Sequence, residues 1–219
     1  MTQLITWPYI LRQGHTNDPS EGACAMDAVN WFAHGLHGDQ PACASPVISA
    51  FVIVGNDAMP DDVRQRLLAY LPRIAGSRSP AHEARRAKIL VVAAFRVFAS
   101  GALDAAGLPD EAAALRIIAD QLDHGLSYGA AGAAARAAWA AGAAARAAWA
   151  AGVAATAAGA AARAARAAKA AEAAEVWEDY FSVLDAVLEA GPQGEPWSAD
   201  ALDAATTRYS AAGGKLETV

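Results

Sequence analysis

Apolar residues along this chain recur at intervals of three and four, and clusters of Gly, Pro, Asn and Asp separate one such segment from the next. Spacing of this kind is typical of amphipathic helices joined by turns. After an irregular arm at residues 1–20, with Asp18 or Ser20 as the first N-cap, it predicts helices over residues 21–33, 46–54, 60–74, 80–99, 110–123, 129–190 and 198–211. Residues 34–45 and 55–59 are expected to be loops.

The segment "VISAFVIV" is the one place where a strand competes with a helix, because it is apolar and rich in β-branched residues. Ser45 followed by Pro46 is a favourable N-cap and first helical residue. Val47, Phe51 and their neighbours also fit one helical face. The chain offers no second strand candidate for pairing, so we predict a helix here.

Alanine dominates the second half of the chain and gives 62 of the 219 residues. The decapeptide "GAAARAAWAA" occurs at 132–141 and again at 142–151, with a degenerate continuation to about residue 175. Alanine is the best helix former. We therefore predict an all-α fold, more than half helical: a helical bundle or array with a long Ala-rich central helix. Whether the repeat is functional or a product of codon slippage stays open.

The chain is expected to form an N-terminal helical region at 1–128 and, at 129–219, the Ala-rich helix with a C-terminal helix, packed into the same domain. Its net charge of −6 and pI near 5.3 argue against general binding to nucleic acids or anionic membranes. The Ala-rich region is basic and the residues after 175 are acidic. Pairing of these two regions within the fold is the simplest consequence.

Two cysteines are too few for a disulfide scaffold of this size. The N-terminus lacks the features of a signal peptide, and no segment reads as a membrane span, so we expect a cytoplasmic protein with reduced, buried cysteines. A Cys24–Cys43 disulfide would require an oxidising compartment.

Candidate metal ligands are Cys24, His34, His37 and Cys43, with the spacing C-x9-H-x2-H-x5-C. Two thiols and two imidazoles suit tetrahedral zinc, but the spacing matches no standard zinc finger. The alternative is structural, with Cys24 on a core-facing helix side, Cys43 anchoring a loop and both histidines solvated. We favour the structural alternative and expect no cofactor.

A second polar cluster comprises Asn56, Asp57, Asp61 and Asp62, and Arg64 follows it closely. Asn and Asp are common in turns and at helix starts, and this is the role we expect for them here. A metal or substrate site is the alternative. The chain has no phosphate loop, nucleophile elbow or zincin motif, so we favour a protein without catalysis.

The stretches "EGACAMDAVNW", "GDQPACASPVISAF" and "GNDAMPDDVRQRLLAYLPRIAGSR" occur in this order. With the Ala/Trp/Arg repeat, they resemble a set of uncharacterised proteins from actinobacteria, other high-GC bacteria and their phages. The resemblance covers about residues 21–100 and supplies no activity. It departs at Gln40, where those proteins often have His, which weakens a metal or acid–base role for that loop. The matching positions are Glu21, Cys24, Met26, Asp39, Pro41, Cys43, Pro46, Val47, Asn56, Asp57, Asp61 and Pro72.

We therefore expect a non-enzymatic helical protein that binds a protein or peptide partner, of immunity or phage–host type by analogy with Ala-rich helical proteins. One alternative is a binder of a small molecule such as an antibiotic, with Trp and Tyr lining the pocket. The other is a metalloprotein or enzyme that uses Cys24, Asp39, Cys43, Asn56 and Asp57. The residues we would assign to binding are Glu21, Cys24, Asp39, Cys43, Asn56, Asp57 and Arg64.

Overall fold

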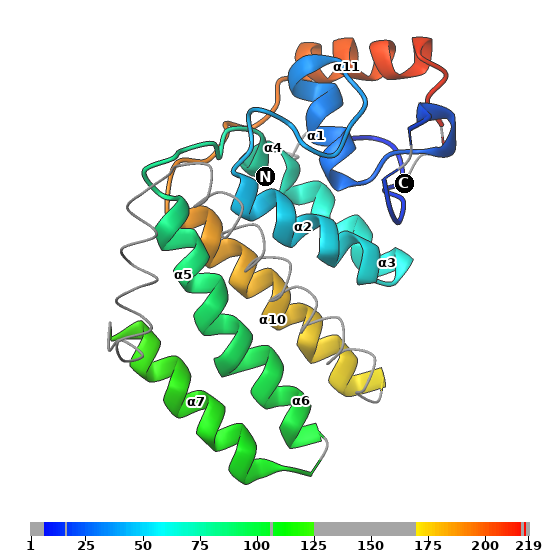
Figure 1. The fold of residues 1–219 in the computed structure, drawn as a ribbon. Coiled ribbons are helices and arrows are strands. Elements are labelled where there is room, and N and C mark those ends of the chain that lie inside the picture. Colours follow the sequence, from blue (N-terminus) through cyan, green and yellow to red (C-terminus); the bar gives the residue numbers. More distant parts are fainter. Residues whose placement is uncertain (1–6, 16, 106, 125–169, 216, 218–219) are drawn as a thin grey trace. The chain divides into compact units, whose positions relative to one another are not determined.

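The fold is all-α, as predicted (Figure 1). The computed structural model describes residues 7–15, 17–105, 107–124, 170–215 and 217, and about two thirds of these are helical. Within these ranges there is no strand beyond a single isolated bridge between Leu11 and Ala23. Most of the predicted Ala-rich central helix lies outside the described residues. Its described end belongs to helix α10, Ala170–Glu189.

The chain divides into two compact units, each with its own core. Unit 1 combines residues 1–80 with the C-terminal residues 191–219, and unit 2 is formed by residues 81–190. The boundary expected at 128/129 lies outside the described residues.

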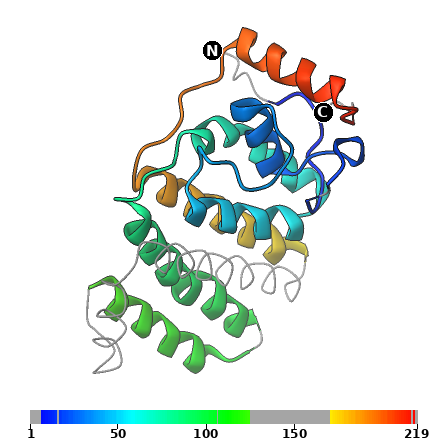
Figure 2. The ribbon, with the colours of Figure 1, turned by 45° about the horizontal axis from the view of Figure 1, so that its top comes forward.

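Unit 1 is built from short helices around α1 (Figures 1 and 2). Helix α1 packs against α2, α4 and α11, and α11 lies beside it in both views. Fully buried side chains such as Phe51, Leu67 and Leu71 form the core. The elements are η1 (Pro19–Glu21), α1 (Ala25–His34), α2 (Pro46–Ala58), α3 (Asp61–Arg64), η2 (Gln65–Ala69), α4 (Leu71–Ala75) and α11 (Ala199–Ala211).

The start of α2 follows the predicted capping chemistry, and the start of α1 does not. The Ser45 hydroxyl accepts a hydrogen bond from the Ile48 amide at 3.2 Å, and Ser198 caps α11 in the same way. Helix α1, however, begins at Ala25 with Cys24 as its N-cap. The expected cap Asp18 instead closes the short η1, because its carboxylate accepts from the Ser20 amide.

The loop predicted at 55–59 is wrong, because α2 continues through Ala58. Gly55 and Asn56 are buried in its last turn, where the polar side chain of Asn56 is fully hydrogen-bonded. The single helix predicted at 60–74 is three short pieces, α3, η2 and α4.

Unit 2 consists of longer helices whose positions match the apolar periodicity. Helix α5 (Glu83–Ala93), the π-helical segment η3 (Ala94–Ala99) and α6 (Ser100–Ala105) follow one another without a break. Helix α7 (Pro109–Asp123) turns back against η3 and α6, and α10 packs against α5 (Figure 1). Leu90, Phe98, Tyr180 and Leu184 are among the buried residues.

Candidate functional site

Asp27 is the centre of the most connected polar cluster in unit 1. It is the third residue of α1, and its side chain is fully buried. Oδ2 accepts a hydrogen bond from the Cys24 amide at 3.1 Å, and Oδ1 accepts one from the Gly38 amide at 3.1 Å. The Cys24 sulfur in turn accepts from the Asp27 amide. The result is a capping box in which cysteine replaces the usual serine or threonine.

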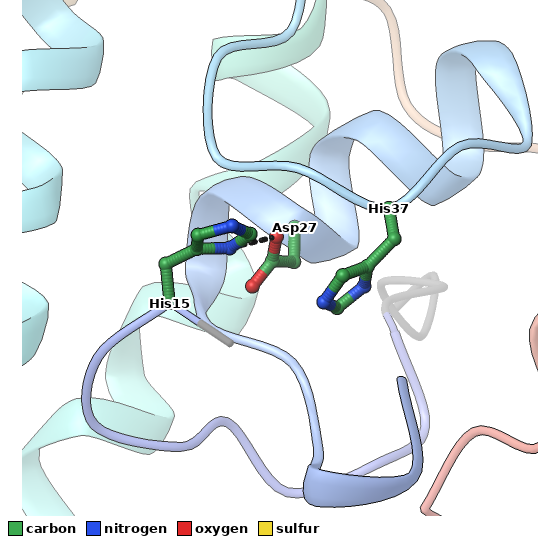
Figure 3. A group of neighbouring side chains, drawn as sticks. All are labelled: His15, Asp27 and His37. Atoms are coloured by element: carbon green, nitrogen blue, oxygen red, sulfur yellow. Dashed lines mark hydrogen bonds and ion pairs between the residues drawn. The ribbon is translucent and has the colours of Figure 1, made fainter. Parts of the chain in front are cut away.

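Two histidines flank this carboxylate (Figure 3). His15 Nδ1 lies 3.0 Å from Asp27 Oδ1, and His37 points toward Asp27 from the other side. The two rings are stacked, with their centroids 5.4 Å apart. One potential ligand atom from each of the three residues lies within 4.8 Å of the others. We call these three residues the His–Asp–His group.

The hydrogen bonds assign different protonation patterns to the two rings. An indole N–H can only donate, and Trp31 Nε1 lies 3.1 Å from His37 Nδ1. His37 Nδ1 therefore carries a lone pair, and the proton of the neutral ring is on Nε2. His15 is the reverse: its Nδ1 donates to the Asp27 carboxylate, so the lone pair of the neutral ring is on Nε2.

The group joins three segments that are separate in the sequence. His15 lies in the N-terminal arm, and Asp27 lies in the first turn of α1. His37 lies in the 35–45 loop. The carbonyl of the next residue, Gly38, accepts a hydrogen bond from the Asn30 side chain. The Asp27 side chain is buried, whereas that of His15 is 29% exposed, so the group is open to solvent on the His15 side.

The cysteines do not belong to the His–Asp–His group. Burial, followed by the nearby Asp27 charge, raises the pKa of the Cys24 thiol well above its usual value. Burial also raises the pKa of Cys43. Both are free thiols, Cys24 buried and Cys43 only half-buried, so the expected burial is confirmed for Cys24 alone. A high pKa disfavours the thiolate, the form that ligates metals.

The four-residue zinc set suggested by the spacing is not assembled. Among the described residues, the single group of three or more potential ligands contains His37 but neither cysteine nor His34. His34 lies exposed in the last turn of α1. Sequence reasoning missed His15 and Asp27, because the former lies in an irregular arm and the latter has the position of a capping residue. The signal for Asp27 was its place three residues after Cys24.

Asn56 and Asp57 hold the N-terminal arm in place. The Asn56 side chain accepts from the Ala25 amide at 3.2 Å and donates to the Arg12 carbonyl at 2.9 Å. The Asp57 carboxylate accepts from the Gly14 amide at 2.8 Å. These bonds place His15 beside α1, so both residues support the group without belonging to it.

Arg64 closes the C-terminal end of α2. Its Nε donates to the Asn56 carbonyl at 2.7 Å, and Nη2 donates to the Met59 carbonyl at 2.6 Å. Asp61 pairs with Nη1, and the Arg64 side chain is only 4% exposed. The contacts of Asn56, Asp57 and Arg64 are thus structural, while Glu21 and Asp39 lie outside the His–Asp–His group.

The chain matches no protein-family model, and no curated protein or solved structure is significantly similar to it. Across the described residues, no helix is both long enough and apolar enough to span a membrane.

Proposed function

We propose that this protein binds one divalent transition-metal ion of the zinc class through His15, Asp27 and His37. The observation that supports the proposal is the convergence of one ligand atom from each residue within 4.8 Å. Imidazole nitrogen and carboxylate oxygen are ordinary zinc ligands. The three side chains come from three segments that share no local turn, so their meeting is a property of the fold.

The spacing of the ligand atoms suits a single ion. Two ligands on one tetrahedral zinc ion, each at roughly 2.0–2.2 Å, lie about 3.3–3.6 Å apart. His15 Nδ1 and Asp27 Oδ1 are already separated by 3.0 Å. Small side-chain rotations of the two histidines would close the remaining gap.

The surroundings of Asp27 also suit a ligand. The amides of Cys24 and Gly38 orient its carboxylate, as outer hydrogen bonds commonly do for residues that ligate metals. The third partner of the carboxylate is now the Nδ1–H group of His15, and an ion would take the place of that proton. Because the carboxylate is buried, it would lose no bulk water when the ion enters.

Three protein ligands leave one position of a tetrahedral ion for water or for an atom of a bound molecule. The ion would also tie the N-terminal arm to α1 and the 35–45 loop. The tie between the three segments fits a stabilising role for the ion, whereas an open position is typical of catalytic zinc. In either case the metalloprotein alternative has a different ligand set from the one the sequence suggested. The protein or peptide partner stays a prediction.

Titration of zinc into chelator-treated protein, monitored by calorimetry, tests the proposal. The absorption spectrum of the cobalt(II)-substituted protein reports the types of ligand. We expect one ion per chain. His15→Ala and His37→Ala should each weaken binding by at least about tenfold. His34→Ala is the matched control, since His34 is exposed on α1 outside the group, and it should leave the affinity unchanged.

The cysteines provide a second control. Cys24→Ser keeps an N-cap residue, and Cys43→Ser changes a half-buried loop position, so both variants should keep the cobalt spectrum of the wild type. That spectrum should contain no thiolate-to-cobalt band, because neither cysteine belongs to the group. Asp27→Asn should weaken binding, with circular dichroism reporting whether α1 persists. Absence of stoichiometric zinc binding, or unchanged affinity in both histidine variants, would overturn the proposal.

A further inference from the structure

We infer that Trp31 and the metal ion compete for His37, so that Trp31 lowers the metal affinity and its indole reports occupancy of the site. This inference rests on the proposed metal binding. It makes Trp31 a tuning residue, because it acts on the ion only through the ring of His37.

The competition follows from the two nitrogens of His37. Trp31 donates to Nδ1, so the neutral ring carries its proton on Nε2. Figure 3 shows the far end of the ring, where Nε2 lies, directed toward Asp27 and His15. An ion at Nε2 therefore requires the proton to move to Nδ1, where it would face the indole N–H.

The other nitrogen leads to the same result. If the ion bound Nδ1, it would occupy the lone pair that now accepts from Trp31. In either case the 3.1 Å hydrogen bond between Trp31 and His37 is lost when the ion binds. The indole N–H must then find another acceptor, and this cost lowers the apparent affinity of the ion.

The position of Trp31 lets the change be observed. The residue is 5% exposed, and its ring packs edge-on against Tyr209 of α11, with centroids 5.5 Å apart. Indole emission depends on the hydrogen bond of its N–H and on neighbouring rings. Loss of the bond to His37 should therefore alter Trp31 fluorescence while the ion binds.

Trp31→Phe is the decisive variant, since it keeps an aromatic ring and removes the donor. We expect zinc to bind about three- to tenfold more tightly, the range set by one hydrogen bond between neutral groups. In the wild type, zinc should change tryptophan emission until one equivalent is bound, and this signal should disappear in Trp31→Phe. A structural role for Trp31 would give the opposite sign, because a loosened site binds more weakly.

Trp197→Phe is the matched control. Trp197 is also buried in unit 1, where it stacks on Phe32 with centroids 3.9 Å apart, and it lies outside the His–Asp–His group. This variant should keep the wild-type affinity and the zinc-dependent emission change. If zinc binds through His15 and His37 but Trp31→Phe binds it no more tightly, only the inference about Trp31 fails. If the wild-type protein binds no zinc, both proposals fail.

Discussion

Different kinds of polar contact stabilise the interior of each of the two units. In unit 1, buried side chains bond to the backbone of distant segments, as Asn56 does with Arg12 and Ala25. In unit 2, the pairs of Arg96 with Asp120 and of Arg116 with Asp104 join exposed side chains between helices. The shape of unit 1 thus depends on particular polar residues, and that of unit 2 on its apolar helix faces.

This difference has an energetic consequence. A buried donor or acceptor that loses its partner costs about 1–3 kcal/mol, whereas an exposed ion pair contributes about 0–1 kcal/mol. Substitutions of polar or closely packed residues should therefore destabilise unit 1 much more than unit 2. Four predictions test the comparison.

The largest effect is expected for Gly194→Ala in unit 1. A Cβ at Gly194 would clash with the carbonyl oxygen of Pro72 and the amide of Gly76, and both are backbone atoms. The backbone segments around Gly194 and Gly76 therefore pack in direct contact. The hydrogen bond from the Gly194 amide to the Arg73 carbonyl, at 3.0 Å, also holds them together. We expect unit 1 to lose more than about 3 kcal/mol, measured by denaturant titration with hydrogen exchange to localise the change.

Gly101→Ala in α6 of unit 2 is the control for that substitution. Apart from the adjacent residues and the helix's own backbone, no atom lies within 4 Å of a Cβ built at Gly101. Alanine should stabilise this helix by up to about 1 kcal/mol. If Gly194→Ala changed the stability as little as Gly101→Ala, the two glycine segments in unit 1 would have moved apart readily to accept the Cβ.

Asn56→Ala should produce the next largest effect. It leaves the Ala25 amide and the Arg12 carbonyl without their partner, so we expect a loss of about 2–4 kcal/mol. Because Arg12 belongs to the arm that presents His15, exchange of the arm amides should also accelerate. A loss below about 1 kcal/mol would show that water replaces the side chain.

The same contrast explains how much of the fold the sequence predicts. In unit 2 the helices predicted at 80–99 and 110–123 are both present, because apolar periodicity indicates them. The second matches α7 closely, whereas the first continues beyond its predicted end through α6 to Ala105. In unit 1 the composition of the "GNDA" stretch predicts a loop. There it ends a helix, since Arg64 caps the last carbonyls from a later segment, a contact that local composition cannot reveal.

The candidate site follows the same rule. The sequence predicted His37 as a potential ligand, but paired it with the cysteines and His34. Its actual neighbours are His15 and Asp27, which meet it only because the arm folds back onto α1. Gly14, with φ at 75°, allows that turn, and Asn56 and Asp57 hold it in place. These bonds span more than forty residues of sequence, so no local pattern contains them.

Alkaline pH should weaken unit 1 to a smaller extent. Burial raises the pKa of Tyr209 to about 12 from an ordinary value of 10, and it raises the pKa of Cys24 as well. The unfolded chain then loses these protons at lower pH than the folded chain. Stability is full below the unfolded pKa values and falls above about pH 9, by up to about 1.4 kcal/mol per pH unit from Tyr209 between pH 10 and 12.

Urea titrations from pH 8 to pH 11 measure this dependence. Cys24→Ser should remove the part that begins near pH 9, and Tyr209→Phe the part that begins near pH 10. Tyr209→Phe also removes the hydrogen bond that its hydroxyl donates to the Pro19 carbonyl, so its stability at pH 8 serves as the baseline. An unchanged pH profile in both variants would contradict the assignment.

The smallest effect is expected for Arg96→Gln in unit 2. Arg96 reaches from η3 to Asp120 at 2.8 Å and Asp123 at 3.3 Å on α7, so the pair looks favourable on geometry alone. However, the arginine side chain is 37% exposed and Asp120 62%, and water and salt screen such charges. We expect a loss of about 0–1 kcal/mol that shrinks in high salt.

Arg86→Gln in the same unit gives the matching buried case, since Arg86 is fully buried against Glu83 and the Val187 carbonyl. Its loss removes a fully buried cation from beside the Glu83 carboxylate, which is 15% exposed, and should cost several times more than the loss of Arg96. Equal effects would mean that burial does not set the sensitivity to polar substitution in either unit. If Arg86→Gln is strongly destabilising and Arg96→Gln is not, a buried polar residue matters in unit 2 as it does in unit 1. The difference between the units then lies in how many buried polar residues each contains.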